Sequence, residues 1–153
     1  MNKSFNKAGQ AGFTMIELIV VIVILGILAA TAMPKFTSLS GDARKASLQA
    51  ARGALSASSA MIHGKYLVDP SKTSIAVEGN AAVGLTNGYP SPTDEFAKAA
   101  GLGDDYKATA STTSLKIEPN NIPPSMTKCF ITYTPATAGG IPSITTPDGY
   151  TCD

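Results

Sequence analysis

The sequence predicts an α+β protein in which one long helix precedes a small antiparallel sheet. An apolar stretch from Phe13 to Met33 runs into a region whose apolar residues recur every three or four positions. Beyond residue 66, short segments alternate apolar and polar residues between proline-rich connectors, as strands do. With 153 residues, 44% of them hydrophobic and 15% charged, the chain can form at most one modest domain beside the apolar segment.

The apolar segment is long enough to cross a membrane. Residues 13–33 as a helix would span about 32 Å at roughly 1.5 Å per residue, against a hydrocarbon core of about 30 Å. An ordinary secretory signal would be cut after this stretch, with Ala29-Ala30-Thr31-Ala32 as its small-residue site. A plain membrane anchor would keep Lys3 and Lys7 on the cytoplasmic side.

Neither interpretation explains Glu17, a lone carboxylate within the apolar stretch. Such a group costs on the order of 2.5 to 3.5 kcal/mol inside a membrane and usually has a function. A cut between Gly12 and Phe13 would create an amine on Phe13, one helical turn from Glu17. Opposite charges about 4 Å apart attract by roughly 4 kcal/mol at an effective dielectric constant near 20, which offsets that cost. We hypothesise that Glu17 is an assembly determinant that meets the Phe13 amine of its own or a neighbouring chain.

A leader with basic residues that ends in Gly12, followed by Phe13-Thr14-Met15-Ile16-Glu17 and an apolar helix, resembles the class III signal of type IV pilins and pseudopilins. The resemblance implies the pilin fold, cleavage between Gly12 and Phe13 by a prepilin peptidase, and methylation of the new Phe13 amine. It also favours contact between Glu17 and the amine of a neighbouring subunit.

The resemblance further implies a place in the cell and a set of partners. The precursor would lie in the inner membrane as a single-pass protein with a periplasmic head, and would polymerise into an extracellular helical homopolymer. The assembly machinery would comprise an inner-membrane platform, an outer-membrane secretin and, acting indirectly, an assembly ATPase. On this basis we expect a leader (1–12), a hydrophobic membrane and filament-core helix (13–36), an amphipathic helix (37–66) and a globular head (67–153).

Gly26 and Pro34 interrupt the long helix. Proline lacks a backbone donor and crowds the carbonyl of Ala30, so we expect a kink near residues 30–34. Gly26 weakens its own turn by up to about 1 kcal/mol relative to alanine. The resemblance implies that the helix between these two residues can lose its regular structure in a filament. A second bend is not expected, because no other proline precedes Pro70.

The second half of the helix carries one apolar face. If the helix continues to about Tyr66, it is 54 residues or about 81 Å long from Phe13. Its apolar face recurs at three- and four-residue intervals and should pack on the head. The expected face is Leu48, Ala51, Leu55, Ser59 and Ile62.

The head should combine short strands with one short helix. We expect a strand at 74–77, a turn at 87–90, and strands around 115–118 and 131–134. Ser91-Pro92-Thr93-Asp94 predicts the start of a helix with Pro92 in its first turn. This helix should bury Phe96, Ala97 and Ala100 and end at Gly101 or Gly103.

Cys129 and Cys152 are the two cysteines of the chain. Cysteines beyond a membrane anchor indicate an oxidising compartment, and closing this loop would stabilise the fold by roughly 3.5 kcal/mol in the chain-entropy model. We therefore predict a disulfide that ties down the carboxy-terminal tail, with two unpaired buried thiols as the alternative. Cys129 has the strand parity of Ile131 and Tyr133 and should face inward.

The sequence gives no sign of an enzyme, a cofactor or a metal site. His63 is the one histidine, and it forms no zinc pattern with the two cysteines, so we expect a solvated or helix-terminal residue. No nucleophile signature surrounds any serine. A chain starting at Phe13 would hold 10 basic residues, the 12 of the sequence less Lys3 and Lys7, against 11 acidic ones. This near-neutral body argues against a general electrostatic grip on nucleic acid.

Scattered short segments resemble MSHA-type pilins, the subunits of mannose-sensitive hemagglutinin fimbriae. They are Pro34-Lys35-Phe36, Gly41-Asp42-Ala43-Arg44, Asn87-Gly88-Tyr89-Pro90 and Tyr133-Thr134-Pro135-Ala136. This second resemblance implies adhesion to host or abiotic surfaces and early biofilm formation.

Two alternative functions share the amino-terminal features. A type II secretion pseudopilin typically binds calcium where this chain has its terminal cysteines, and no dense Asp/Asn cluster suits that ion here. A minor pilin that captures DNA or sugar would need a basic or aromatic patch, for which Lys107, Lys116 and Lys128 are the candidates.

Overall fold

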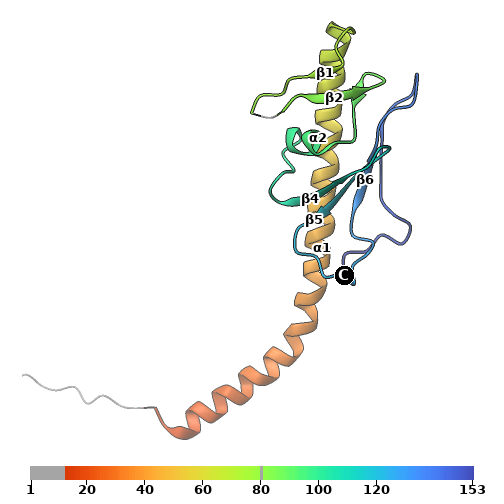
Figure 1. The fold of residues 1–153 in the computed structure, drawn as a ribbon. Coiled ribbons are helices and arrows are strands. Elements are labelled where there is room, and N and C mark those ends of the chain that lie inside the picture. The colour runs from red at the N-terminus through yellow and green to blue at the C-terminus, as the bar shows by residue number, and fades with distance from the viewer. Residues whose placement is uncertain (1–12, 80) are drawn as a thin grey trace, which may run out of the picture. The chain divides into compact units, whose positions relative to one another are not determined.

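The structure, a computed structural model, describes residues 13–79 and 81–153, with the backbone alone for residues 34–38. It divides into two compact units, Met1–Ser38 and Leu39–Asp153. We call the second unit the head. The α+β class predicted from the sequence is confirmed, because one long helix is followed by antiparallel strands (Figure 1).

Helix α1 (Met15–Val68) contributes to both units. In the first unit, Met15–Met33 is long and apolar enough to cross a membrane, with a mean hydropathy of 2.7 and none of it buried. The hydroxyl of Thr31 donates to the carbonyl of Leu28 at 2.9 Å, a local bond that competes with the helix ladder. The side chain of Pro34 lies outside the described residues, so the kink expected around Gly26 and Pro34 stays a prediction.

The predicted apolar face of α1 is the core of the head. Leu48, Leu55 and Ile62 are at most 2% exposed, and the two smaller residues of the face are buried with them. The helix ends at Val68, two residues later than expected. It ends there because Pro70 cannot extend the helix and restricts the residue before it.

Two antiparallel sheets pack with this helix. One consists of β1 (Ser74–Ile75), β2 (Val83–Thr86) and β3 (Tyr89–Pro90). The other is a meander of β4 (Tyr106–Ala110), β5 (Leu115–Pro119), β6 (Ile131–Thr134) and β7 (Ser143–Thr145). The expected strands at 115–118 and 131–134 are present, and the one expected at 74–77 is shorter. Between β2 and β3, Asn87 and Gly88 form the turn, with φ angles of 52° and 82°.

Helix α2 (Asp94–Ala99) corrects one prediction. Thr93 is its N-cap in an extended conformation, so Pro92 precedes the helix and does not lie in its first turn. The end is as predicted, because Gly101 has a φ of 77° and the N–H of Leu102 bonds to the carbonyl of Ala97 at 2.9 Å.

His63 is a structural residue of the head. Its Nδ1 lies 2.9 Å from the carbonyl oxygen of Gly88, and its ring stacks on Tyr89 with the centroids 3.9 Å apart. A Cβ on Gly88 would lie 2.6 Å from the ring of Tyr66, so the turn fits against the helix only with glycine there. His63 thus lies near the end of α1, as expected, and it contacts the β2–β3 turn, which packs against this part of the helix.

Tyr133 occupies the centre of the core. Its hydroxyl donates to the carbonyl of Pro90 at 2.8 Å, and its ring lies 4.8 Å from that of Phe96. Burial raises the pKa of Tyr133 to about 12. The bond to Pro90 links the two sheets, because β6 carries the donor and β3 the acceptor.

Cys129 and Cys152 form a disulfide, and both are fully buried. The pairing expected from the sequence is thus present. It ties the end of the chain to the residues just before β6.

We predict that reducing this disulfide destabilises the head by roughly 3.5 kcal/mol, because the unfolded chain regains the entropy of an open loop. Urea unfolding of the full chain in detergent, with and without reductant, measures the difference through the transition midpoint. Equal midpoints, in samples whose masses differ by the two hydrogens of reduction, would contradict the prediction.

We predict that Tyr133 makes the head sensitive to alkali. Its pKa is near 10 when unfolded and about 12 when folded, so its protonated form favours folding below pH 10. This stabilisation, of roughly 1 to 2 kcal/mol after allowance for solvent screening, is lost as the pH rises from 10 to 12.

The Tyr133→Phe variant isolates this effect. It lacks the bond to Pro90 and should be less stable at neutral pH by about 1 kcal/mol. The difference in unfolding free energy between the two proteins should shrink as the pH rises from 10 to 12. Parallel stability curves across this range would contradict the role of Tyr133.

Candidate processing and assembly site

The start of α1 is closed by a reciprocal cap between Thr14 and Glu17. Both the backbone N–H and the hydroxyl of Thr14 donate to Oε2 of Glu17 at 2.8 Å. The N–H of Glu17 donates back to the hydroxyl of Thr14 at 3.3 Å. This is a capping box, in which the residue before the helix and the third helical residue satisfy each other's free donors. Thr14 is the residue that our sequence reasoning missed, although its spacing from Glu17 is a readable signal.

Because of this cap, α1 begins at Met15, and Phe13 lies outside the helix. In the uncut chain Phe13 and Glu17 therefore do not share a helical turn, and the charge pair expected after cleavage stays a prediction. The physical reason is that the bonds between Thr14 and Glu17 satisfy the free donors at this end and close the helix there. The peptide bond from Gly12 to Phe13 is intact here, so Phe13 has no charged amine. Gly12 itself lies outside the described residues.

Every hydrogen bond that the structure gives to the carboxylate of Glu17 ends on Oε2. Within the described part of the chain, Oε1 remains available to a further donor. The surrounding side chains are apolar and open, with Phe13 94% and Ile16 69% exposed. The carboxylate of Glu17 is thus bonded to the start of its own helix, and it is the one charged side chain between residues 13 and 33.

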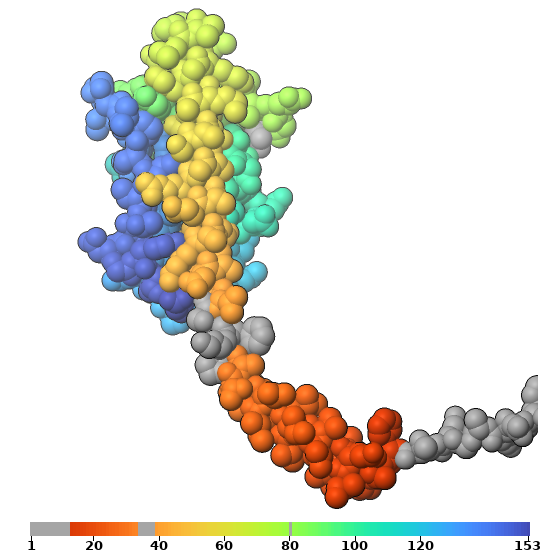
Figure 2. Space-filling model, turned by 180° about the vertical axis from the view of Figure 1, so that it is seen from behind, coloured from red at the N-terminus to blue at the C-terminus, as the bar shows by residue number. Residues whose placement is uncertain are grey.

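The head carries a second uncovered surface on α1. Figure 2 shows this face of the helix, in orange and yellow, between the carboxy-terminal segments and the middle of the chain. Seven small exposed residues follow one another along it at alternating spacings of three and four. We call them the small-residue stripe: Ala43, Ala46, Ala50, Gly53, Ala57, Ala60 and Gly64. A Cβ added at Gly53 or Gly64 would meet no atom within 4 Å.

The three lysines considered for a basic patch are not a free cationic cluster. Lys116 pairs with Glu118 at 2.7 Å and lies 4.5 Å from the centre of the Phe130 ring. Lys107 and Lys116 line one hollow of about 400 Å³, but Glu118 lines it too. Lys128 is absent from that hollow and approaches Gly149. The arrangement gives little attraction for an anion.

Among residues 13–33, 39–79 and 81–153, no group of three His, Cys, Asp or Glu side chains could hold a metal ion. Both cysteines are consumed by the disulfide.

Comparison with known proteins finds a family model at the start of the chain and a curated relative that matches part of it. The family model described as the prokaryotic N-terminal methylation motif covers residues 7–33. A curated relative, the type IV narrow pilus major component PilA5 of Thermus thermophilus, is 50% identical over 44 residues, or 29% of this chain. The match spans 38% of that relative's length. No solved structure matches. Residues 7–33 therefore carry an N-terminal methylation motif, and the Thr14–Glu17 cap lies inside it.

Proposed function

We propose that this chain is the structural subunit of a type IV pilus, and that its apolar helix anchors the precursor in the inner membrane and then forms the filament core. The observation that carries the proposal is the N-terminal methylation motif on an exposed apolar helix with one carboxylate. A prepilin peptidase cuts between Gly12 and Phe13, and the new amine of Phe13 is methylated. The same scheme assigns residues 1–12 to the leader, 13–36 to the core helix, 37–66 to the amphipathic helix and 67–153 to the globular part.

Cleavage changes what Glu17 can do. The cut removes the chain before Phe13 and leaves a positive amine two residues from the capped helix start. The cap occupies Oε2 of Glu17, and Oε1 can accept a hydrogen bond from the amine of a neighbouring subunit. A charge-assisted bond of this kind is about twice as strong as a neutral one. In an apolar filament core it sets the axial register of subunits, because either charge alone is costly there.

The small-residue stripe supports self-assembly of the chain. Small side chains at alternating spacings of three and four let two helix backbones approach closely. The stripe is uncharged and lies in the same helix as the apolar segment. A homopolymer therefore has two stretches of α1 that tolerate close neighbours, the apolar stretch Met15–Met33 and the small-residue stripe of the head.

The proposal extends to the kind of filament. We assign the chain to an MSHA-like fimbria that attaches cells to host or abiotic surfaces and promotes biofilm formation. The buried disulfide at the carboxy terminus supports a pilin over a pseudopilin of type II secretion. Assembly would require the inner-membrane platform, the assembly ATPase and the outer-membrane secretin, and would carry the head from the periplasm to the cell exterior.

Three variants separate the charge of Glu17 from its capping role. Glu17→Val removes both, and Glu17→Gln keeps a capping acceptor without charge. Thr14→Val keeps the charge and the backbone bond to Glu17 but loses both bonds of the Thr14 hydroxyl. We predict that both Glu17 variants stay in the membrane, are processed, and form no filaments. Thr14→Val should form filaments in reduced amount, because its helix start loses about 1 kcal/mol of capping.

Electron microscopy of sheared filaments and intact-mass measurement of the membrane fraction test this. The mass confirms removal of the leader, so a processing defect cannot be mistaken for an assembly defect. Normal filaments from Glu17→Gln, together with none from Thr14→Val, would show that the cap and not the charge directs assembly.

Deletion of the gene tests the function as a whole. We predict loss of long surface fibres and of surface attachment, with protein secretion unchanged, and immunogold label along the length of wild-type fibres. Failed secretion without fibre loss would identify a pseudopilin instead. Label confined to fibre tips would identify a minor subunit.

A further inference from the structure

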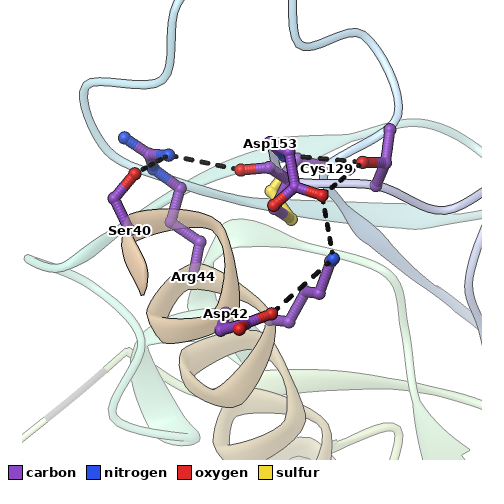
Figure 3. Close-up of polar contacts among 8 residues, drawn as sticks. Ser40, Asp42, Arg44, Cys129 and Asp153 are labelled. Atoms are coloured by element: carbon purple, nitrogen blue, oxygen red, sulfur yellow. Dashed lines mark hydrogen bonds and ion pairs between the residues drawn. A yellow bond between two sulfur atoms is a disulfide. The ribbon is translucent and has the colours of Figure 1, made fainter. Parts of the chain in front are cut away.

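Cys152 and Asp153, near the carboxy terminus, contact the first turns of α1 in the head (Figure 3). Nη1 of Arg44 donates to the carbonyl oxygen of Cys152 at 3.2 Å. Nζ of Lys45 forms an ion pair with Oδ2 of Asp153 at 3.1 Å. Arg44 also donates to the hydroxyl of Ser40, one turn earlier, at 3.2 Å, which orients its guanidinium toward the tail.

Gly41 lets the tail lie directly on the helix. A Cβ at this position would collide with the carboxylate of Asp153, and would lie 3.1 Å from the backbone oxygen of Cys152. Gly41 is buried, although it lies seven residues before Leu48, the first large core residue of α1. Glycine in the middle of a helix is unfavourable in itself. Its presence here is explained by the close approach of the tail.

The tail is fixed at its other side by a covalent bond. Cys152 is joined to Cys129, two residues before β6. Thr151 donates to the carboxylate of Asp153 at 3.3 Å and supports its position. Residues 151–153 therefore connect α1 to the four-stranded sheet, through polar contacts on one side and a disulfide on the other.

We propose that residues 151–153 are a latch that fixes α1 to the head from Gly41 onward. With the latch in place, local unfolding of the helix is limited to residues that precede Gly41. Helices in proteins are held mainly by the packing of one face. Between Leu39 and Ser47, Gly41 is the one buried residue of α1. The attachment of these turns to the head therefore depends on Arg44, Lys45 and the tail. Without the latch, these turns unfold together with the helix that precedes Gly41.

The latch involves a single chain and does not rest on the proposed pilus function. It gives the disulfide a role beyond general stability, because the bond holds the carbonyl of Cys152 where Arg44 can reach it. Reduction should therefore release the helix turn as well as the tail.

A matched pair of glycine variants tests the proposal by hydrogen exchange with mass spectrometry on the full chain in detergent. In Gly41→Ala the new Cβ forces the carboxylate of Asp153 aside and crowds the backbone oxygen of Cys152, whereas in Gly53→Ala, in the same helix, the new Cβ meets no atom within 4 Å. We expect backbone amides 40–46 to exchange about tenfold faster in Gly41→Ala, with amides 55–62 unchanged. Gly53→Ala should not speed exchange in either range, because alanine favours the helix.

Two further samples keep the test decisive if Gly41→Ala does not fold. Reduced wild-type protein and the double variant Arg44→Gln/Lys45→Gln should both show faster exchange confined to amides 40–46. If the tail exchanges faster in these samples while amides 40–46 exchange at the wild-type rate, the latch proposal is overturned, because the helix turns are then stable without the tail. Unchanged exchange in both the tail and the helix of Gly41→Ala would overturn the close contact on which the latch rests.

Discussion

The head depends on the packing of one face of α1, because neither sheet is large enough to form a core alone. Leu48, Leu55 and Ile62 are the centre of this face, and the residues of β5 and β6 that meet the core are just as deeply buried. Short strands and hairpins are marginal in water without such a partner. The apolar face of the helix, in turn, has only five residues, two of them small. Stable packing of the helix on the head therefore needs contacts beyond apolar packing.

Those contacts lie near both ends of the packed face. At one end the hydroxyl of Tyr106 donates to the carbonyl of Ser47 at 2.9 Å and lies 2.6 Å from the hydroxyl of the same serine. At the other end His63 meets Gly88. Each joins α1 to a different sheet, since Tyr106 begins β4 and Gly88 precedes β3. Directional bonds of this kind fix the position of the helix along its axis, which apolar packing specifies less strictly.

The sequence predicted what depends on local pattern and missed what depends on contacts far along the chain. The apolar face of α1, the strands at 115–118 and 131–134 and the stop at Gly101 all follow from periodicity or turn chemistry. Strand β4 was missed because Tyr106-Lys107-Ala108-Thr109-Ala110 has little apolar side chain, and its pairing with β5 makes it a strand. The bond from Arg44 to Cys152 spans 108 residues and leaves no local signal. The Thr14–Glu17 cap does have a local signal, because threonine stands three residues before glutamate at the start of an apolar run.

The cap also changes how the charge of Glu17 is to be understood. A carboxylate that only awaited a partner subunit would be costly in the precursor, since no intermolecular amine exists before cleavage and assembly. Two donors from Thr14 lower that cost from the outset, because hydrogen-bonded charges tolerate apolar surroundings better than bare ones. Under the proposed function, the precursor thus holds the side chain of Glu17 in place at the helix start, with one oxygen still open. Assembly then adds a partner to a carboxylate already in position, and no rearrangement of the helix start is required.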